Sequence, residues 1–146
     1  MTDSKEKEFE DRWCLGWRGL RIEGVARIGG QVQFDIGETS SLTLAAPFTL
    51  AEKAADIPGV KPREFDPSDG LAPEIEALAG QTIRAALGFK DGRLRVAFSS
   101  GQHLNAPRGH GHPSWMAHGE TGRSWEATAD GELSVYSARR TADPEE

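Results

Sequence analysis

The sequence predicts an α+β domain that is mostly antiparallel β: two related three-stranded meanders, a C-terminal hairpin and one helix. Three observations predict this class. The stretch 19–47 recurs, loosely rewritten, as 80–107. Apolar and polar residues alternate along both copies, which is typical of strands with one buried and one solvent-exposed face. Glycine-containing turns separate the alternating runs, as hairpins require.

Each copy of the repeat predicts three strands. They are expected at 19–28, 31–36 and 41–45 in the first copy and at 82–89, 93–99 and 102–105 in the second. The alternation is clearest at Leu94, Val96 and Phe98. A lone meander would be marginally stable, because its apolar face needs a cover. The second copy can supply that cover, and the sequence leaves open whether the two copies form one sheet or two.

The segment between the copies predicts a linker and then a helix. Prolines and glycines interrupt the residues after Pro47, which leaves room only for an edge strand near 63–65. A helix is expected from Ser68 or Asp69 to Ala79, with Leu71, Ile75 and Leu78 on one stripe and Gly80 just past the end.

The last predicted element is a hairpin with strands at 124–129 and 132–137, turning at Asp130-Gly131. The domain boundaries follow from the polar ends of the chain. Residues 13–137 form the single predicted domain, while 1–12 and 138–146 are rich in charge and predicted to be disordered tails.

Composition excludes some partners. The 17 basic and 23 acidic residues give a net charge of −6, which argues against nucleic acid or an anionic membrane as the partner. No apolar stretch approaches the roughly 18–20 residues of a membrane span. The lone Cys14 cannot close an internal disulfide, and the first residues lack the apolar core of a signal peptide. A cytoplasmic protein is expected, of undetermined oligomeric state.

Four histidines within sixteen residues suggest a metal site. His110, His112 and His118 lie in a predicted loop, and His103 lies on the strand before it. Imidazoles bind zinc and other divalent transition metals, and a His-x-His pair on an extended segment faces one side. The spacing matches no established zinc motif, however. A solvated, glycine-rich surface loop is the competing interpretation.

Tryptophans provide the candidate binding residues. Trp115 and Met116 lie in the polar loop, and Trp125 alternates with core positions of the last hairpin. Trp115 can either plug the end of the core or stand exposed as a contact residue. A small-ligand pocket between the two meanders, lined by Trp115 and Trp125, is a further hypothesis.

No catalytic constellation stands out. The glycines occupy hairpin turns, which differs from a phosphate-binding loop between a strand and a helix. Ser99 or Ser100 with His103 lacks a third orienting group, and Cys14 between Trp13 and Leu15 reads as a packing residue. A non-catalytic role is favoured, although the sequence does not decide whether the protein is an enzyme.

Three segments carry a family resemblance. They are GWRGLRIEGV…LTLAAPFTL, then LAGQTIRAALGFKDGRLRVAFSSGQHLNAP, then HPSWMAHGETGRSWEATADGELSVY. In this order they resemble a family of small bacterial proteins of unknown function, over about residues 16–136. Family members close on a Gly-Gly-x-Leu-x-Val-aromatic strand, similar to 131–136 here. This chain carries His and Gly in a loop where the family is rich in aspartate. The resemblance implies no activity.

Two function hypotheses remain from these observations. The first is a non-catalytic protein-interaction module without a cofactor, of the immunity or inhibitor type, whose acidic surface suits a basic protein partner. The alternative is a metal-binding or metal-dependent protein that uses the histidines from His103 to His118.

Overall fold

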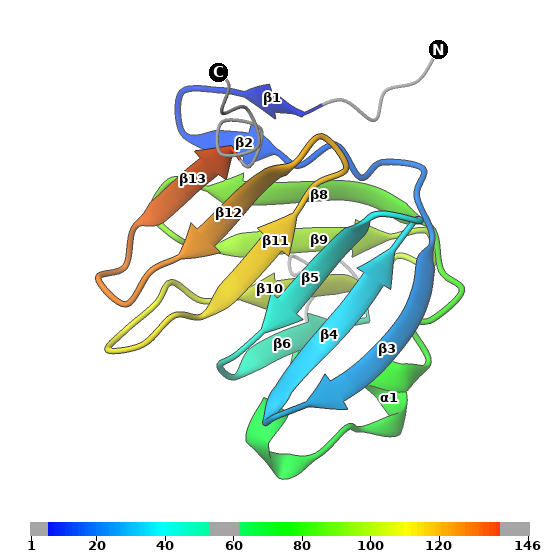
Figure 1. Cartoon of the computed structure of the whole chain (residues 1–146). Coiled ribbons are helices and arrows are strands. Elements are labelled where there is room, and N and C mark those ends of the chain that lie inside the picture. Colours follow the sequence, from blue (N-terminus) through cyan, green and yellow to red (C-terminus); the bar gives the residue numbers. More distant parts are fainter. Residues whose placement is uncertain (1–5, 53–61, 138–146) are drawn as a thin grey trace.

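Two antiparallel sheets packed face to face make up the protein (Figure 1). The computed structural model describes residues 6–52 and 62–137. One sheet has seven strands in the order β1-β2-β8-β9-β10-β6-β7, and the other has six in the order β13-β12-β11-β5-β4-β3. The architecture is a β-sandwich, in which the two inner faces supply a shared core.

The strand bounds are as follows. The seven-stranded sheet contains β1 (Lys7–Glu8), β2 (Arg12–Cys14), β8 (Ile83–Phe89), β9 (Leu94–Phe98), β10 (His103–Ala106), β6 (Phe48–Ala51) and β7 (Arg63–Phe65). The six-stranded sheet contains β13 (Leu133–Ser137), β12 (Arg123–Ala127), β11 (Trp115–His118), β5 (Ser40–Leu44), β4 (Gln31–Ile36) and β3 (Ile22–Ile28).

Both predicted meanders are present, one in each sheet. Strands β3, β4 and β5 are consecutive neighbours in the six-stranded sheet, and β8, β9 and β10 are consecutive neighbours in the seven-stranded sheet. After each meander the chain crosses to the opposite sheet, so that β6 pairs with β10 and β11 pairs with β5. The predicted C-terminal hairpin (β12 and β13) and the predicted edge strand β7 are also observed.

The two meanders begin with the same hydrogen bonds. Arg21 and Thr82 form an isolated antiparallel bridge between the start of one meander and the start of the other. Four backbone bonds flank it and match in pairs at an offset of 61 residues: Ile22 to Gln81 with Ile83 to Leu20, and Gly19 to Ile83 with Gly80 to Ile22. The register irregularity near the start of β3 also has its counterpart in β8.

The core lies between the sheets. Its largest fully buried side chains are aromatic: Trp17, Trp115, Trp125, Phe34, Phe48 and Phe98. They come from both sheets and from the segment before β3. Burying a large apolar side chain contributes roughly 1.5–3 kcal/mol, so these rings dominate the stability of the sandwich.

The predicted helix from Ser68 or Asp69 to Ala79 is wrong in length. The structure has a 3-10 turn η1 (Pro67–Asp69) and a single helical turn α1 (Pro73–Glu76). Gly70, with φ 115°, separates the two because its backbone lies outside the helical region. The expected stripe survives in part, since Ile75 and Leu78 are buried.

Side-chain bonds fix the η1 turn against β3. The backbone N–H and the hydroxyl of Ser68 both donate to Asp66 Oδ1, at 3.0 and 2.8 Å. These bonds favour the ionised carboxylate and lower the pKa of Asp66. Arg27, on the neighbouring edge strand β3, donates to the carbonyl oxygens of Pro67 and Ser68.

Four strands lie where none was predicted. Strand β11 occupies the predicted histidine loop, because β5 and β12 bond it on both sides. Strand β6 lies at the start of the predicted linker. Strand β1 and the first residue of β2 fall within the predicted tail 1–12. The predicted tail 138–146, residues 1–5 and linker residues 53–61 lie outside the described part of the chain.

Candidate functional site

The two tryptophans proposed as binding residues are core residues. Trp115 is 1% exposed, and its indole N–H donates to the carbonyl oxygen of Gly92 at 2.9 Å. Trp125 is fully buried and packs edge-on against Trp13, with ring centroids 5.9 Å apart. Their rings fill the space between the sheets, where the sequence also allowed a ligand pocket.

Met116 lies on the other side of its strand. It is half-buried on the outer face of the six-stranded sheet, because side chains alternate along β11 and its neighbours Trp115 and Ala117 point inward. Trp115 and Met116 thus lie on opposite sides of β11, although both border a small groove over the six-stranded sheet, whereas Trp125 borders none of the grooves described below.

The structure does not bring the candidate metal ligands together. His103 lies on the outer face of the seven-stranded sheet, while His118 lies on the outer face of the six-stranded sheet and contacts Ser124 Oγ at 2.8 Å. His110 and His112 are exposed in the loop before β11. Within residues 6–52 and 62–137, no group of three or more His, Cys, Asp or Glu side chains is placed to hold a metal ion.

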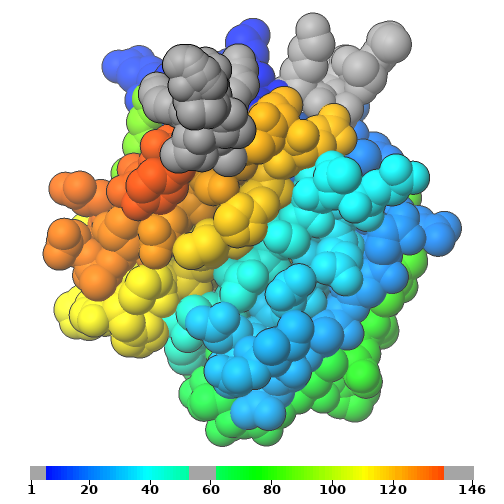
Figure 2. Space-filling model, viewed as in Figure 1, coloured from blue at the N-terminus to red at the C-terminus, as the bar shows by residue number. Residues whose placement is uncertain are grey.

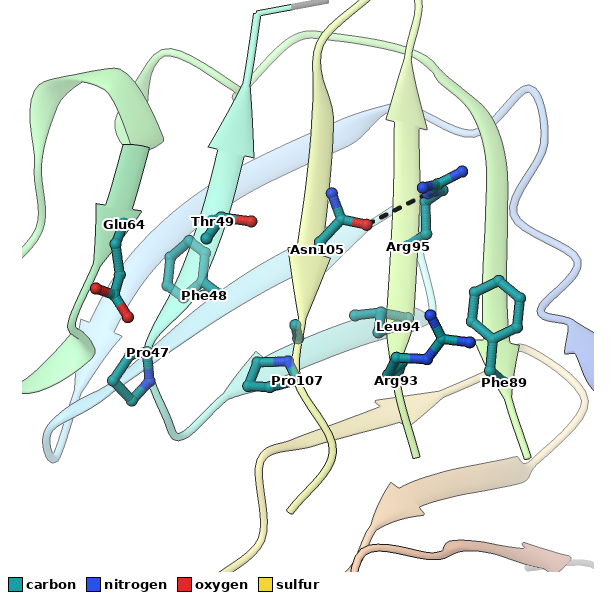
Figure 3. A pocket seen from close by; sticks show the side chains of 11 residues that line it. Pro47, Phe48, Thr49, Glu64, Phe89, Arg93, Leu94, Arg95, Asn105 and Pro107 are labelled. Atoms are coloured by element: carbon teal, nitrogen blue, oxygen red, sulfur yellow. Dashed lines mark hydrogen bonds between the residues drawn. The ribbon is translucent and has the colours of Figure 1, made fainter. Parts of the chain in front are cut away.

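A groove crosses one end of the seven-stranded sheet on its outer face (Figure 3). Its volume is about 460 Å³, within the range of ligand-binding clefts. Residues from β8, β9, β10, β6 and β7 line it, so it runs across the strands. Five separate segments of the chain thus contribute to one surface.

One cross-strand row of side chains forms the polar part of this groove. Arg95 pairs with Asn105, Asn105 pairs with Thr49, and Thr49 pairs with Glu64. Paired residues in a sheet project from the same face, and in Figure 3 the four side chains follow one another in this order. We call Arg95, Asn105, Thr49 and Glu64 the charged row.

The charged row has opposite charges at its ends. Arg95 donates through Nε to Asn105 Oδ1 at 3.3 Å, which holds the guanidinium over the groove. In the part of the chain that the structure describes, neither Arg95 nor Glu64 forms an ion pair. Both side chains are exposed. The groove therefore offers an unpaired cation, a carboxamide, a hydroxyl and an unpaired anion, in that order.

A second line of residues borders the same groove. It consists of Phe89, Arg93, Pro107 and Pro47 (Figure 3). The Arg93 guanidinium lies 4.8 Å above the centre of the Phe89 ring and pairs with Asp91 at 2.9 Å. Arg93 and Arg95 are two positions apart, which places two guanidinium groups at the β9 end of the groove.

The opposite sheet carries a matching row. Gln33 pairs with Thr43, Thr43 with Met116, and Met116 with Glu126. Two of these four, Gln33 and Thr43, lie 62 positions before Arg95 and Asn105, and Glu126 lies 62 positions after Glu64. We call Gln33, Thr43, Met116 and Glu126 the neutral-ended row, after its glutamine. It lies on the face that Figure 2 presents.

The second groove is smaller and differs in charge. Its volume is about 210 Å³, and Gln31, Thr43, Met116 and Glu126 are among its lining residues. Gln31 corresponds to Arg93, just as Gln33 corresponds to Arg95. Glu126 accepts a hydrogen bond from the Tyr136 hydroxyl at 3.3 Å, whereas Glu64 has no such neighbour in the described residues.

Sequence reasoning missed the charged row. The pairings of Asn105 with Thr49 and of Thr49 with Glu64 join strands that were not both predicted. One signal was present in the sequence: the 62-residue offset continues beyond the recognised repeat to Glu64 and Glu126, while Arg95 replaces Gln33.

Comparison with known proteins places the chain in a family. No helix among the described residues is long and apolar enough to cross a membrane. No curated protein and no solved structure matches the chain. Residues 13–137 match the model of a family described as "Family of unknown function (DUF6188)". Because this match covers most of the sequence, the chain belongs to that family of unknown function.

Proposed function

We propose that this protein is a non-catalytic protein-interaction module that binds its partner in the groove across the seven-stranded sheet. The observation that carries the proposal is the charged row. Its two ends, Arg95 and Glu64, are exposed and have no ion-pair partner in the described residues. Unpaired charges at a surface are available to a partner, and complementary charges give specificity and faster association.

The rigidity of the groove supports this role. Arg95, Asn105 and Thr49 lie on three adjacent strands whose inward neighbours, among them Leu94 and Leu104, are fully buried. A packed core fixes the backbone beneath the groove, so the groove binds with little loss of conformational entropy.

The net charge and the small size of the protein support a more specific role. The net charge of −6 favours a basic protein partner through long-range attraction. An immunity or inhibitor role fits a small acidic module of this kind, and under it the partner loses its own activity in the complex. The two meanders are then copies of one unit, in which the second copy carries Arg93 and Arg95 where the first has Gln31 and Gln33.

The test uses the partner that co-purifies with the protein from its native host. The protein and its Arg95→Ala/Glu64→Ala variant are each mixed with the isolated partner, and the affinity of each complex is measured at several salt concentrations. The proposal expects a stoichiometric complex whose affinity falls with salt, and on the order of a fivefold to tenfold weaker complex for the variant. The matched control, Gln33→Ala/Glu126→Ala, alters the opposite groove and is expected to bind like the unmodified protein.

Two results would count against the proposal. One is the recovery of no stoichiometric partner. The other is a complex that the Arg95→Ala/Glu64→Ala variant forms with unchanged affinity. If the partner is inhibited in the complex, the immunity or inhibitor role is supported; if its activity is unchanged, that finer role fails while the interaction module stands.

A further inference from the structure

We infer that the groove binds an extended peptide segment of the partner, laid across the strands, with one acidic and one basic side chain four residues apart. This inference rests on the proposed function and specifies what the partner presents. It follows from the spacing and the opposite charges of the charged row.

The spacing comes from the register of the sheet. Arg95 and Glu64 are the ends of a row that crosses β9, β10, β6 and β7. Neighbouring strands lie about 4.8 Å apart, so the three intervals between these residues span about 14 Å. An extended chain advances about 3.4 Å per residue and alternates its side chains, so residues four apart lie about 14 Å apart on one face.

The middle of the row suits a peptide backbone. The Asn105 amide nitrogen and the Thr49 hydroxyl lie between the two charges and have no hydrogen-bond partner among the described residues. Both can donate to carbonyl oxygens of a bound chain. Beside them, Pro47 and Pro107 provide apolar contact, while the Phe89 ring lies at the β8 end of the groove beneath the Arg93 guanidinium.

Charge complementarity sets the expected sequence of the segment. Arg95, with Arg93 two positions before it, would pair with a carboxylate. Glu64, at the other end, would pair with a lysine or arginine. On the opposite sheet, Gln31 in the smaller groove and Gln33 in the neutral-ended row occupy the two arginine positions, and Glu126 already accepts a hydrogen bond from Tyr136. The opposite groove therefore lacks the cationic end and serves as an internal control.

The experiment measures binding of fluorescein-labelled seven-residue peptide pools by fluorescence anisotropy at low salt. One pool has Asp at position 2 and Lys at position 6, with the remaining positions drawn from Gly, Ala, Ser, Leu and Tyr. Three other pools carry two Asp, two Lys, or Asp at position 2 with Lys at position 5. The inference expects the Asp/Lys pool with four-residue spacing to bind about fivefold more tightly than the others.

Charge-switch variants give a readout beyond loss of binding. Arg95→Glu makes both ends of the row acidic and is expected to move the preference to the pool with two Lys. Glu64→Arg makes both ends basic and should move it to the pool with two Asp. Matched variants of the opposite groove, Gln33→Glu and Glu126→Arg, are expected to leave the preference unchanged.

The outcomes separate this inference from the proposed function. Equal binding of all pools, or a preference that does not switch with the variants, overturns the inference. If the native partner still needs Arg95 and Glu64 in that case, the interaction module stands without the peptide. A monomer–dimer equilibrium that Arg95→Glu abolishes would assign the groove to a second copy of the chain and would also overturn the inference.

Discussion

The two grooves of this protein have the same construction and different chemistry. Each lies on the outer face of one sheet, where the third strand of one meander pairs with the strand that has crossed from the other half. Each polar row ends in a glutamate, Glu64 or Glu126. At the other end one row has Arg95 and the other has Gln33, and the groove with the arginine has about twice the volume, 460 against 210 Å³.

This difference separates what folding requires from what it leaves free. The inward residues beneath both rows are buried and apolar, among them Leu94 and Val32. The outward residues Arg95 and Gln33 contribute little to the core, so either is compatible with the fold. The charges of the larger groove are therefore free to serve binding, and variants that exchange residues between the grooves test that distinction.

The largest expected effect comes from the buried aromatic residues beneath the two grooves. Phe48 begins β6 and Trp115 begins β11, and each is about 1% exposed. Phe48→Ala and Trp115→Ala should each lower the free energy of unfolding by about 3–5 kcal/mol, measured by chemical denaturation. Met116→Ala, on the outer face beside Trp115, is the control and should cost much less. A loss below about 1 kcal/mol for Trp115→Ala would contradict its role in the core.

The next effect tests whether the two meanders begin alike. Gly19 and Gly80 both have positive φ, 88° and 93°, and space for a Cβ atom. Alanine at either position is strained in the left-handed backbone conformation. Gly19→Ala and Gly80→Ala should therefore each lower the free energy of unfolding by about 1–2 kcal/mol. The two losses should agree within about 0.5 kcal/mol. A difference above about 1 kcal/mol would break the correspondence between the meanders.

A smaller effect on stability is expected from exchanging the row ends. Arg95→Gln and Gln33→Arg should each change the free energy of unfolding by less than about 0.5 kcal/mol, because both side chains project outward. Thermal unfolding checks this. Arg95→Gln should nevertheless weaken partner binding on the order of threefold or more, whereas Gln33→Arg should not. A large loss of stability in Arg95→Gln would mean that the row serves the fold.

The smallest effect concerns the η1 turn, which lies between the two halves. Because Ser68 donates two hydrogen bonds to Asp66, the pKa of Asp66 is lower in the folded state than in the unfolded chain. Its contribution to stability is therefore fully present above the unfolded pKa of about 3.9 and is lost as the pH falls through the folded pKa. Asp66→Ala should lower the melting temperature slightly at pH 7 and leave less difference at pH 2. An equal difference at both pH values would contradict this.

Local alternation predicted most of the strands. The runs around Phe34 and Val96 gave both meanders because one face of each strand is apolar and the other polar. Strand β11 was missed because only four residues are in the strand and histidine, glycine and proline surround them. The predicted helix is too long because Leu71, Ile75 and Leu78 fit a helical stripe. In the structure the positive φ of Gly70 interrupts the helical backbone, and α1 is a single turn.

Local sequence patterns do not predict the charged row. Its residues Thr49 and Asn105 are 56 positions apart and meet only because β6 crosses to the other sheet. Long-range strand pairing leaves no periodic signal in one sequence. Tryptophan content also does not distinguish a binding residue from a core residue, and Trp115 and Trp125 are both buried in the sandwich.

The most direct test of the central claim is an NMR titration of the ¹⁵N-labelled protein with its isolated partner. The backbone amides of Arg95, Asn105, Thr49 and Glu64 report on one groove, and those of Gln33, Thr43, Met116 and Glu126 report on the other. We expect the first set to shift or broaden on binding and the second set to stay in place. Changes confined to the second set, or absent from both, would contradict the assignment of the charged row as the binding site.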